Sequence, residues 1–336
     1  MTGERAYSFD HIERLSDHHG LYEHARHTTR RAEHGYCTDD NARLLVVTSR
    51  EPDHGAAHRL SRLALGFVLD AQSADGSVRN RKNRHGRWTD HFGTEDCWGR
   101  SVWGLGVAAA RHEDHSIREW ADRGLGAAMR QRSEWPRAMA YAVLGACEVA
   151  GDHRHRAAAC QLMVDALAVI GPVPAGDWHW PEPRLRYGNA VLAEAVVAAG
   201  IALNRSDDVE RGLHMLDWLL RLELHSGHLS VTGVGGRGPN DMSPQFDQQP
   251  IEVAAMADAC ARAFDVTGDH RWVEGVDAAS AWFNGDNDAG LVMFDRSSGG
   301  GYDGLHADAV NLNQGAESTL ALISTMQRAN ACSYSR

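Results

Sequence analysis

The sequence has few features that would indicate a metal site, a disulfide framework or a membrane span. Six cysteines occur among 336 residues, and no two of them form a CxxC pair. Isolated cysteines in apolar helical stretches behave as small hydrophobic side chains, so neither a zinc site nor a disulfide framework is expected. No apolar run is long enough to span a bilayer, and the first residues lack the apolar stretch of a signal peptide. We therefore expect a cytoplasmic protein with no membrane contact, no bound metal and no other cofactor.

Positive charge is also in short supply. The chain has 34 Lys and Arg residues against 45 Asp and Glu residues, which gives a formal net charge of −11. An acidic surface repels phosphate backbones, and this argues against nucleic acid as a partner. The basic segment at 79–84 is one short loop, which is typical of a solvated or anion-contacting segment. Hydrophobic residues make up 43% of the chain, a composition typical of a globular protein with a large core.

Strand patterns are scarce, and helical periodicity takes their place. Alternation of apolar and polar residues is confined to 229–232 and 291–294. Segments rich in alanine, leucine and arginine, which are strong helix formers, recur along the chain. They predict about twelve helices, over 8–19, 38–51, 56–72, 94–112, 115–133, 134–150, 153–170, 188–204, 207–223, 250–267, 270–285 and 315–330. Thr38, Thr94 and Ser133 are the expected N-caps of three of them.

The connections between the predicted helices alternate in length. The short ones are 52–55, 113–114, 151–152, 205–206 and 268–269, and the long ones are 20–37, 73–93, 171–187, 224–249 and 286–314. The join near Ser133 is a tight exception. Bundles and superhelical arrays normally keep all their connections short, at about 2–8 residues. The alternation over about six helical pairs predicts an all-α (α/α)6 toroid, a single domain over 1–336 with its long loops on one rim.

An acidic motif recurs at the predicted starts of the even-numbered helices. The segment Thr38-Asp39-Asp40-Asn41-Ala42-Arg43 resembles Thr94-Glu95-Asp96-Cys97-Trp98-Gly99-Arg100, and each follows a long loop. The helix dipole favours an acid in the first turn of any helix by about 0.3–1 kcal/mol, so one acid per helix needs no functional explanation. Aromatic, histidine-rich and glycine-rich loops beside each acid go beyond that. If the even-numbered helices form the inner ring, their amino ends meet at one cavity.

Four carboxylates are the candidate catalytic residues. Glycoside cleavage needs one protonated and one ionised carboxyl group, and acids crowded into a partly desolvated cavity have separated pKa values. Asp40 and Asp96 are the leading pair because they occupy equivalent places in the repeat. Glu182, between two prolines, and Asp247, just before a predicted helix, come next. Each of the four also has a structural explanation, as a helix cap, a rim ion pair or a rigid loop corner.

The candidate substrate-binding residues surround these acids. Carboxylate, amide and guanidinium groups suit sugar hydroxyls, and aromatic rings suit the apolar face of a pyranose. Arg43 and Arg100 end the two repeats and are also expected to depress the pKa of one carboxylate. The predicted substrate-binding residues are Asp39, Arg43, Trp88, Glu95, Arg100, His179, Trp180, Gln248, Gln249, Glu252, Tyr302 and Glu317.

Several motifs resemble those of a known bacterial helical domain. They are the segment 34–43, Asp247-Gln248-Gln249-Pro250, the segment 299–304 and the segment 313–318. That domain is attached to, or encoded beside, bacterial glycosyltransferases and β-mannoside phosphorylases, and it is similar to the six-hairpin, (α/α)6-barrel glycosidase superfamily over nearly the whole chain. The resemblance implies a functional link to a glycosyltransferase or glycoside phosphorylase, and a mannoside as the first substrate to consider. Unsaturated glucuronyl hydrolases share the barrel, but this sequence lacks a clear match to them beyond the placing of Asp40 and Asp96.

Three functions stay open at this point. The first, which we expect, is a glycoside hydrolase acting on an oligosaccharide through paired carboxylates at the amino ends of the inner helices. The second is a sugar isomerase or 2-epimerase on the same barrel with histidines as acid and base, which predicts His179 near the sugar carbonyl. The third is a non-catalytic glycan-binding module that serves a glycosyltransferase.

Overall fold

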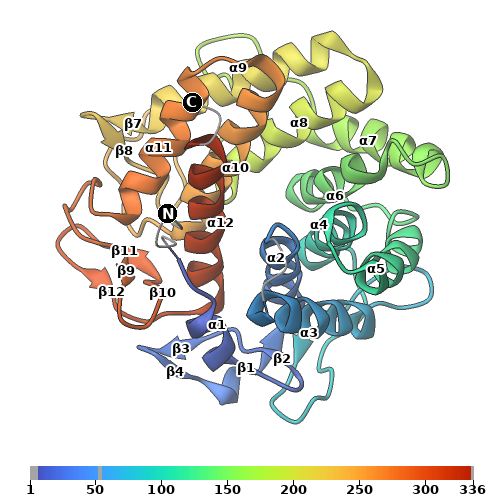
Figure 1. Cartoon of the computed structure of the whole chain (residues 1–336). Helices are drawn as coiled ribbons and strands as arrows, with labels where there is room; N and C mark the ends of the chain where they lie inside the picture. Colours follow the sequence, from blue (N-terminus) through green and yellow to red (C-terminus); the bar gives the residue numbers. More distant parts are fainter. Residues whose placement is uncertain (1–6, 52–54, 334–336) are drawn as a thin grey trace.

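The structure, a computed structural model, describes residues 7–51 and 55–333 (Figure 1). Residues 1–6, where we expect no signal peptide, and 52–54, in an expected short connection, lie outside these ranges. Twelve α-helices occur within them: α1 Asp10–Leu15, α2 Thr38–Ser49, α3 Gly55–Ala71, α4 Asp96–Arg111, α5 His115–Ala128, α6 Pro136–Val149, α7 Arg156–Ile170, α8 Asn189–Leu203, α9 Ser206–Glu223, α10 Pro250–Thr267, α11 Arg271–Phe283 and α12 Ala316–Ser333. No helix in the described ranges combines the length and the apolar character needed to cross a membrane.

The even-numbered helices form a closed inner ring (Figure 1). Each packs on the next, from α2 through α4, α6, α8 and α10 to α12, and α12 packs on α2. The odd-numbered helices lie outside this ring, each against an inner helix. The predicted all-α (α/α)6 toroid is confirmed.

Burial follows from this arrangement. In α8, an inner helix, every residue from Asn189 to Gly200 is buried. In the outer helix α9 the buried residues form one stripe, namely Gly212, Met215, Leu216, Leu219, Leu220 and Glu223. A stripe at helical spacing is what a helix shows when one face packs on a core and the other faces water. Because α8 is covered on both sides, its sequence is apolar nearly all round.

Glycines bring α4 and α6 into close contact. A Cβ atom on Gly106 would lie 2.2 Å from the backbone oxygen of Gly145, and one on Gly145 would lie 2.0 Å from that of Val102. Because only glycine lacks a Cβ, only glycine allows two backbones to approach this closely. The spacing of these residues therefore determines how tightly the ring closes on this side.

The long connections lie at the amino ends of the inner helices and form what we call the amino-end rim. They carry one 3-10 turn, Ala32–His34, and twelve two-residue strands in six two-stranded sheets. The strand pairs are β1 Ser16–Asp17 with β2 Gly20–Leu21, β3 Ala25–Arg26 with β4 Thr29–Arg30, β5 Tyr36–Cys37 with β6 Arg81–Lys82, β7 Leu224–His225 with β8 His228–Leu229, β9 Phe294–Asp295 with β10 Gly300–Gly301, and β11 Gly304–Leu305 with β12 Val310–Asn311. The β5–β6 pair joins two loops that precede different inner helices.

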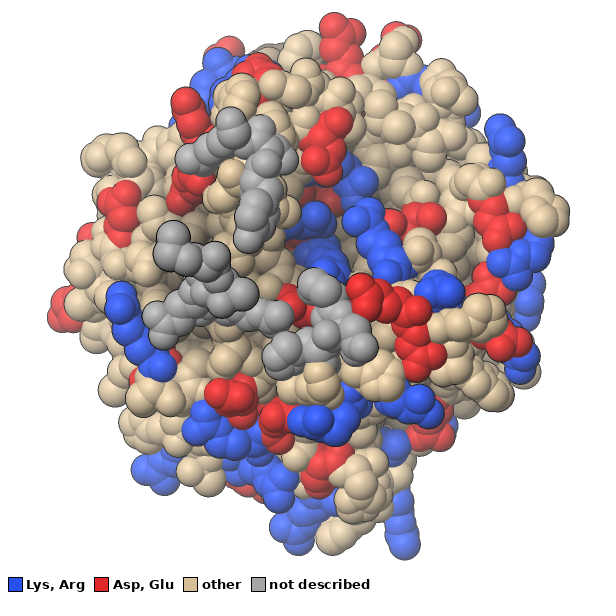
Figure 2. All heavy atoms as spheres, in the orientation of Figure 1, with Lys and Arg blue, Asp and Glu red and all other residues tan. Residues whose placement is uncertain are grey.

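The opposite side, the carboxyl-end rim, holds the short connections and the carboxyl ends of the inner helices. Figure 2 looks onto this side and shows Lys and Arg atoms gathered in the hollow at the middle of the ring. Lys82, the only lysine in the chain, lies in β6 on the other rim, so the basic atoms in the hollow belong to arginines.

Several local predictions were wrong. The first helix spans only Asp10–Leu15, because residues 16–17 leave it to pair with residues 20–21. The helix predicted over 115–133 ends at Ala128. Most of the predicted strands at 229–232 and 291–294 are loop, and only Leu229 and Phe294 belong to strands.

The three predicted N-caps were also wrong. Cys37 is the N-cap of α2, and its Sγ accepts the backbone N–H of Asp40, while the Thr38 hydroxyl donates to the Arg79 carbonyl at 2.6 Å. α4 begins after Glu95 and α6 after Trp135, both without a capping side chain. The hydroxyl of Ser133 instead accepts the Trp135 N–H at 3.1 Å, because α6 starts at a proline three residues later.

Candidate active site

A cavity of about 420 Å³ opens at the amino ends of α2 and α12, and we call it the first cavity. Its lining consists of Glu23, His24, Cys37, Asp39, Asp40, Arg43, Arg81, Arg100, Asp247, Gln249, Asp303, Asn311, Gly315, Glu317 and Ser318. Six of these residues are carboxylic acids and three are arginines. The size is typical of a small-ligand site. In this confined space the pKa values of two neighbouring carboxyl groups move apart, upward for Asp40 and downward for Asp39.

Asp40 lies at the centre of one ion-paired group. It is in the first turn of α2 and only 2% exposed. Arg43 donates from Nη1 to Asp40 Oδ1 and from Nη2 to Glu317 Oε2, each at 2.6 Å, so one guanidinium joins α2 to α12. Burial raises the pKa of Asp40 to about 7; the charges of Glu317 and Glu23 add to the rise, and that of Arg43 opposes it. Asp40 therefore exchanges its proton near neutral pH.

Asp39 and Asp96 share the other arginine of the repeat. Arg100 donates from Nη1 to Asp39 Oδ1 at 2.7 Å, and its Nη2 lies 3.5 Å from Asp96 Oδ2. Burial alone would raise the pKa of Asp39, but the Arg100 and Arg43 guanidiniums and the Asn80 amide outweigh it and lower that pKa. The two copies of the repeat thus lie side by side on α2 and α4, as predicted, although Asp96 does not line the first cavity.

Asp247 differs from the other acids because nothing donates to its carboxyl group within the described residues. Its Oδ1 has no hydrogen-bond partner among these residues, and the Nδ1 atom of His306 lies 3.9 Å from it. Gly304 leaves room for it, since a Cβ there would lie 2.2 Å from Oδ1. The side chain is 23% exposed and lines the first cavity. Burial raises the pKa of Asp247. It is a carboxyl group free to act on a bound molecule.

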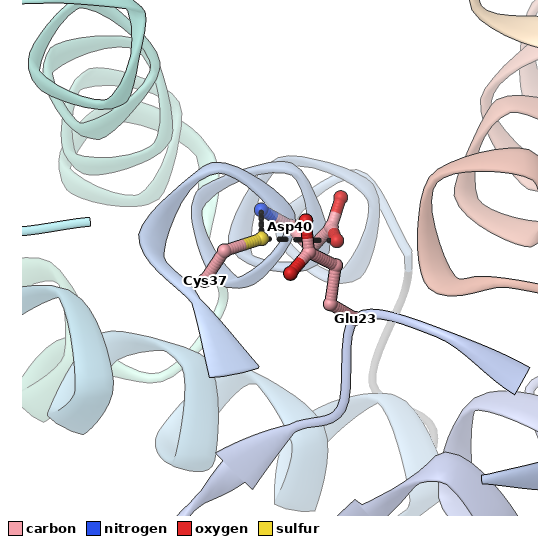
Figure 3. A group of neighbouring side chains, drawn as sticks. All are labelled: Glu23, Cys37 and Asp40. Atoms are coloured by element: carbon pink, nitrogen blue, oxygen red, sulfur yellow. Dashed lines mark hydrogen bonds between the residues drawn. The ribbon is translucent and has the colours of Figure 1, made fainter. Parts of the chain in front are cut away.

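Glu23, Cys37 and Asp40 form a group of side chains whose ligand atoms all lie within 4.8 Å of one another (Figure 3). These are metal-ligand residue types, but their atoms already have other partners. The Cys37 thiol donates to Asp40 Oδ2 at 3.1 Å, and Arg81 donates to Glu23. Burial and the neighbouring acids raise the pKa of Cys37 well above its usual value, which favours the thiol form that donates to Asp40. The group fits a hydrogen-bonded support for Asp40 better than a metal site.

A second cavity of about 550 Å³ adjoins the first. Its lining consists of Arg184, Leu185, Arg186, Tyr187, Thr232, Gly233, Val234, Gly235, Gly236, Gln249 and Glu252. Gln249 lines both cavities. Glu252, in the first turn of α10, accepts the backbone N–H groups of Gly188 at 2.5 Å and Asn189 at 3.2 Å, and so holds the start of α8. Burial raises the pKa of Glu252 to about 7.

Other predicted site residues lie on the amino-end rim but outside both cavities. Glu182 forms a bidentate salt bridge with Arg137, in which both hydrogen bonds are 2.8 Å long. This salt bridge anchors the loop before α8. Glu95 and His179 are exposed to solvent and line neither cavity. Tyr302 is half-buried, and its backbone N–H bonds the Met293 carbonyl.

Three of the predicted substrate-binding residues pack against, or form hydrogen bonds with, other side chains and do not line either cavity. Trp180 is fully buried and stacks on Trp218 with ring centroids 6.0 Å apart. Gln248 is also fully buried, donating to Asp288 at 2.6 Å and accepting from Trp282 at 3.2 Å. Trp88 packs on Phe67 beside Lys82, away from both cavities. Their loops pass close to the cavities, but these side chains point elsewhere.

Sequence reasoning missed Glu23, Arg81 and Tyr187 as cavity residues. Glu23 stands in a long loop without a motif, and Arg81 belongs to the basic segment that we expected to be solvated. Tyr187 lies two residues before α8. Its position could have identified it as a cavity residue, since an aromatic residue just before an inner helix lies on the amino-end rim. Asp303 lines the first cavity and accepts from Gly315 N–H at 2.7 Å, where it holds the start of α12.

Comparison with known proteins shows what the fold resembles. No protein-family model matches the chain, and no curated protein matches it. A sugar epimerase from a ruminal bacterium is 13% identical with a TM-score of 0.70, over 96% of this chain and 95% of that one. A cellobiose 2-epimerase from Bacillus thermoamylovorans is 10% identical with a TM-score of 0.70, over 96% of each chain. A GH76 α-mannanase from Bacteroides thetaiotaomicron is 11% identical with a TM-score of 0.66, over 96% and 93%. At these identities the likeness shows the (α/α)6 toroid fold alone.

Proposed function

We propose that the protein is a glycoside hydrolase that acts on an oligosaccharide. The observation that carries this proposal is Asp247, a carboxyl group without a hydrogen-bond donor that faces the same cavity as Asp40. Burial raises the pKa of both groups. Two carboxyl groups in one cavity, at least one of them protonated near neutral pH, are what glycoside cleavage requires. The enzymes of similar fold named above act on sugars, which supports the same class of substrate.

The geometry suggests a role for each acid. Asp247 lines the first cavity and precedes by two residues Gln249, which lines both, so we assign it the proton transfer to the oxygen of the departing sugar. Asp40, with Arg43 and Glu317 beside it, is the second carboxyl group, on the side of the first cavity. The excess of carboxylates there favours the positive charge that develops on the sugar ring in the transition state. Asp96 has no place in the cavity lining, and we propose that it positions Arg100.

A panel of glycosides tests this function directly. The purified protein is incubated with oligosaccharides, mannosides first because of the motif resemblance, and the released sugars are separated by chromatography. We expect at least one glycoside to be cleaved, and the Asp40→Asn and Asp247→Asn variants to lose this activity with an unchanged circular dichroism spectrum. Full turnover by both variants would overturn the proposal. Tight binding in calorimetry without turnover would instead indicate a glycan-binding module serving a glycosyltransferase.

A sugar isomerase or 2-epimerase is the second candidate, because two of the structures compared above are epimerases. Such an enzyme moves a proton beside the sugar carbonyl. His179 cannot serve in this role in the described conformation, since it is exposed and lines neither cavity. His24 lines the first cavity and His306 lies beside Asp247, so these are the histidines to replace. Proton NMR of mannose, glucose and cellobiose incubated with the protein separates the two functions. An isomerase or epimerase converts the monosaccharides or changes cellobiose into another intact disaccharide, whereas a hydrolase leaves the monosaccharides unchanged and at most releases glucose from cellobiose.

A further inference from the structure

The two cavities meet at Gln249, which lines both of them, and Asp247, two residues earlier in the chain, lines the first. The backbone N–H of Val234, in the loop of the second cavity, donates to the Asp247 carbonyl at 2.8 Å, and Gly233 packs against Phe246. The loop that walls the second cavity therefore holds the residue whose carboxyl group faces the first. A bond cleaved at Asp247 has one sugar in each cavity.

The lining charges of the two cavities indicate which cavity holds which sugar of the substrate. The first has six acids against three arginines, whereas the second has Arg184 and Arg186 against Glu252. The sugar ring that becomes positively charged in the transition state is stabilised by the acidic cavity. The second cavity has no such excess of acids, so it suits the sugar that leaves.

We propose that the second cavity binds the leaving-group sugar and that this sugar stacks on the ring of Tyr187. This inference rests on the proposed function. The substrate is then an oligosaccharide long enough to fill both cavities, rather than a single sugar. Tyr187 is 45% exposed and lines the second cavity. The Arg137 guanidinium lies 4.8 Å from the ring centroid and also donates to the Tyr187 carbonyl.

These contacts prepare the ring for a sugar. The Arg137 guanidinium covers one face of the Tyr187 ring. Because a bidentate salt bridge to Glu182 holds Arg137 in position, the Tyr187 ring is also held in place before a ligand binds. The uncovered part of Tyr187 belongs to the cavity wall. Gln249 stands beside it as a polar group, because its side-chain amide has no hydrogen-bond partner among the described residues. An aromatic surface beside a free amide provides an apolar contact for the pyranose ring and hydrogen bonds for its hydroxyls.

The test compares two substrates of the same sugar. Mannotriose needs both cavities, whereas mannosyl fluoride, with a leaving group of one atom, needs only the first; if the panel identifies another sugar, its trisaccharide and fluoride replace them. We expect Tyr187→Ala to raise the KM for the trisaccharide about three- to tenfold, the range for one aromatic contact, and to leave the KM for the fluoride unchanged. Tyr187→Phe keeps the ring and is expected to restore the wild-type KM.

Trp120→Ala is the matched control, because Trp120 is 53% exposed but lies on the outer helix α5. It is expected to change neither KM. An equal effect of Tyr187→Ala on both substrates, or no effect on either, would overturn the assignment of the second cavity while leaving the hydrolase intact. Failure of the wild-type protein to cleave the trisaccharide and the fluoride would instead overturn the proposed function itself.

Discussion

The two rims of the ring differ in how their charges are satisfied. At the amino-end rim six acids face three arginines in the first cavity, and no residue in the described part of the chain donates a hydrogen bond to the Asp247 carboxyl group. At the carboxyl-end rim, Asp258 on α10 pairs with Arg50 at 3.0 Å and with Arg328 on α12 at 2.5 Å. There Arg262 also pairs with Glu194 at 2.9 Å, which joins α10 to α8.

Helix dipoles account for the sign of the charge on each rim. Acids are favoured at amino ends and arginines at carboxyl ends, and the basic atoms in the hollow of Figure 2 lie at the carboxyl ends. Dipoles do not account for the difference in pairing. Paired charges hold neighbouring helices together, whereas an unpaired, partly buried acid costs stability and is kept only where it does chemistry. This difference supports the proposed active site at the amino-end rim, whereas the ion pairs at the carboxyl-end rim join neighbouring inner helices.

The largest effect is expected at the unpaired acid. Asp247→Asn keeps the size of the side chain but removes the proton that the leaving group needs. We expect kcat for the best oligosaccharide to fall about 10²- to 10⁴-fold, the usual contribution of a general acid. Because the Asp247 carboxyl group accepts no hydrogen bond, we expect the melting temperature not to fall. The control is Asp308→Asn, an exposed acid on the same rim that lines neither cavity. A similar loss of kcat in both variants would contradict the comparison.

The next effect belongs to the paired rim. Asp258→Ala leaves Arg50 and Arg328 buried without their shared partner, and breaking a buried pair in this way costs about 3–5 kcal/mol. Urea denaturation should show this loss in the free energy of unfolding, with kcat unchanged under conditions where the variant is folded. Asp265→Ala, at an exposed position of the same helix, is the control. A variant of Asp258 with wild-type stability would show that the ion pairs do not close the ring.

A smaller effect is expected in the pH dependence of stability. Burial raises the pKa of Asp40 to about 7 from an ordinary value of 3.8, so the folded state binds a proton that the unfolded state releases. The stabilising contribution of this proton is complete below about pH 4 and is lost as the pH rises through 7. Asp40→Asn removes this dependence. We expect the fall in melting temperature between pH 5 and pH 8 to be smaller in the variant than in the wild type, and parallel curves would contradict the assignment.

The smallest effect is expected at the exposed edge of the paired rim. Arg111 binds both carboxylate oxygens of Glu148, at 2.7 and 3.0 Å, but its side chain is 52% exposed. Because water screens such a pair, Arg111→Ala should change the free energy of unfolding by less than about 1 kcal/mol. Urea denaturation beside Asp258→Ala measures the contrast. A loss as large as that of Asp258→Ala would show that exposure does not separate the two kinds of pair.

The helical ring could be predicted from the sequence because its signals are local and repeated. Helical periodicity, the alternation of short and long connections, and the acids of the repeat at Asp39–Asp40 and Glu95–Asp96 all lie within short segments. They correctly placed Asp40, Arg43 and Arg100 at neighbouring amino ends of the inner ring. Each of these inferences needs only the period of a helix and the direction in which its amino end points.

Only the tertiary structure decided which loop side chains reach the cavities. Trp180 and Trp88 were predicted to bind substrate and Tyr187 was not, yet Trp180 is buried against Trp218 and Trp88 packs on Phe67, while Tyr187 lines a cavity. The position of the Asp247 side chain depends on two features of the folded chain. The backbone carbonyl of Asp247 accepts a hydrogen bond from Val234, and Gly304 leaves space for the carboxyl group. A loop residue has no periodic pattern that fixes its direction, so its partners come from segments distant in the sequence, and folding alone brings them together.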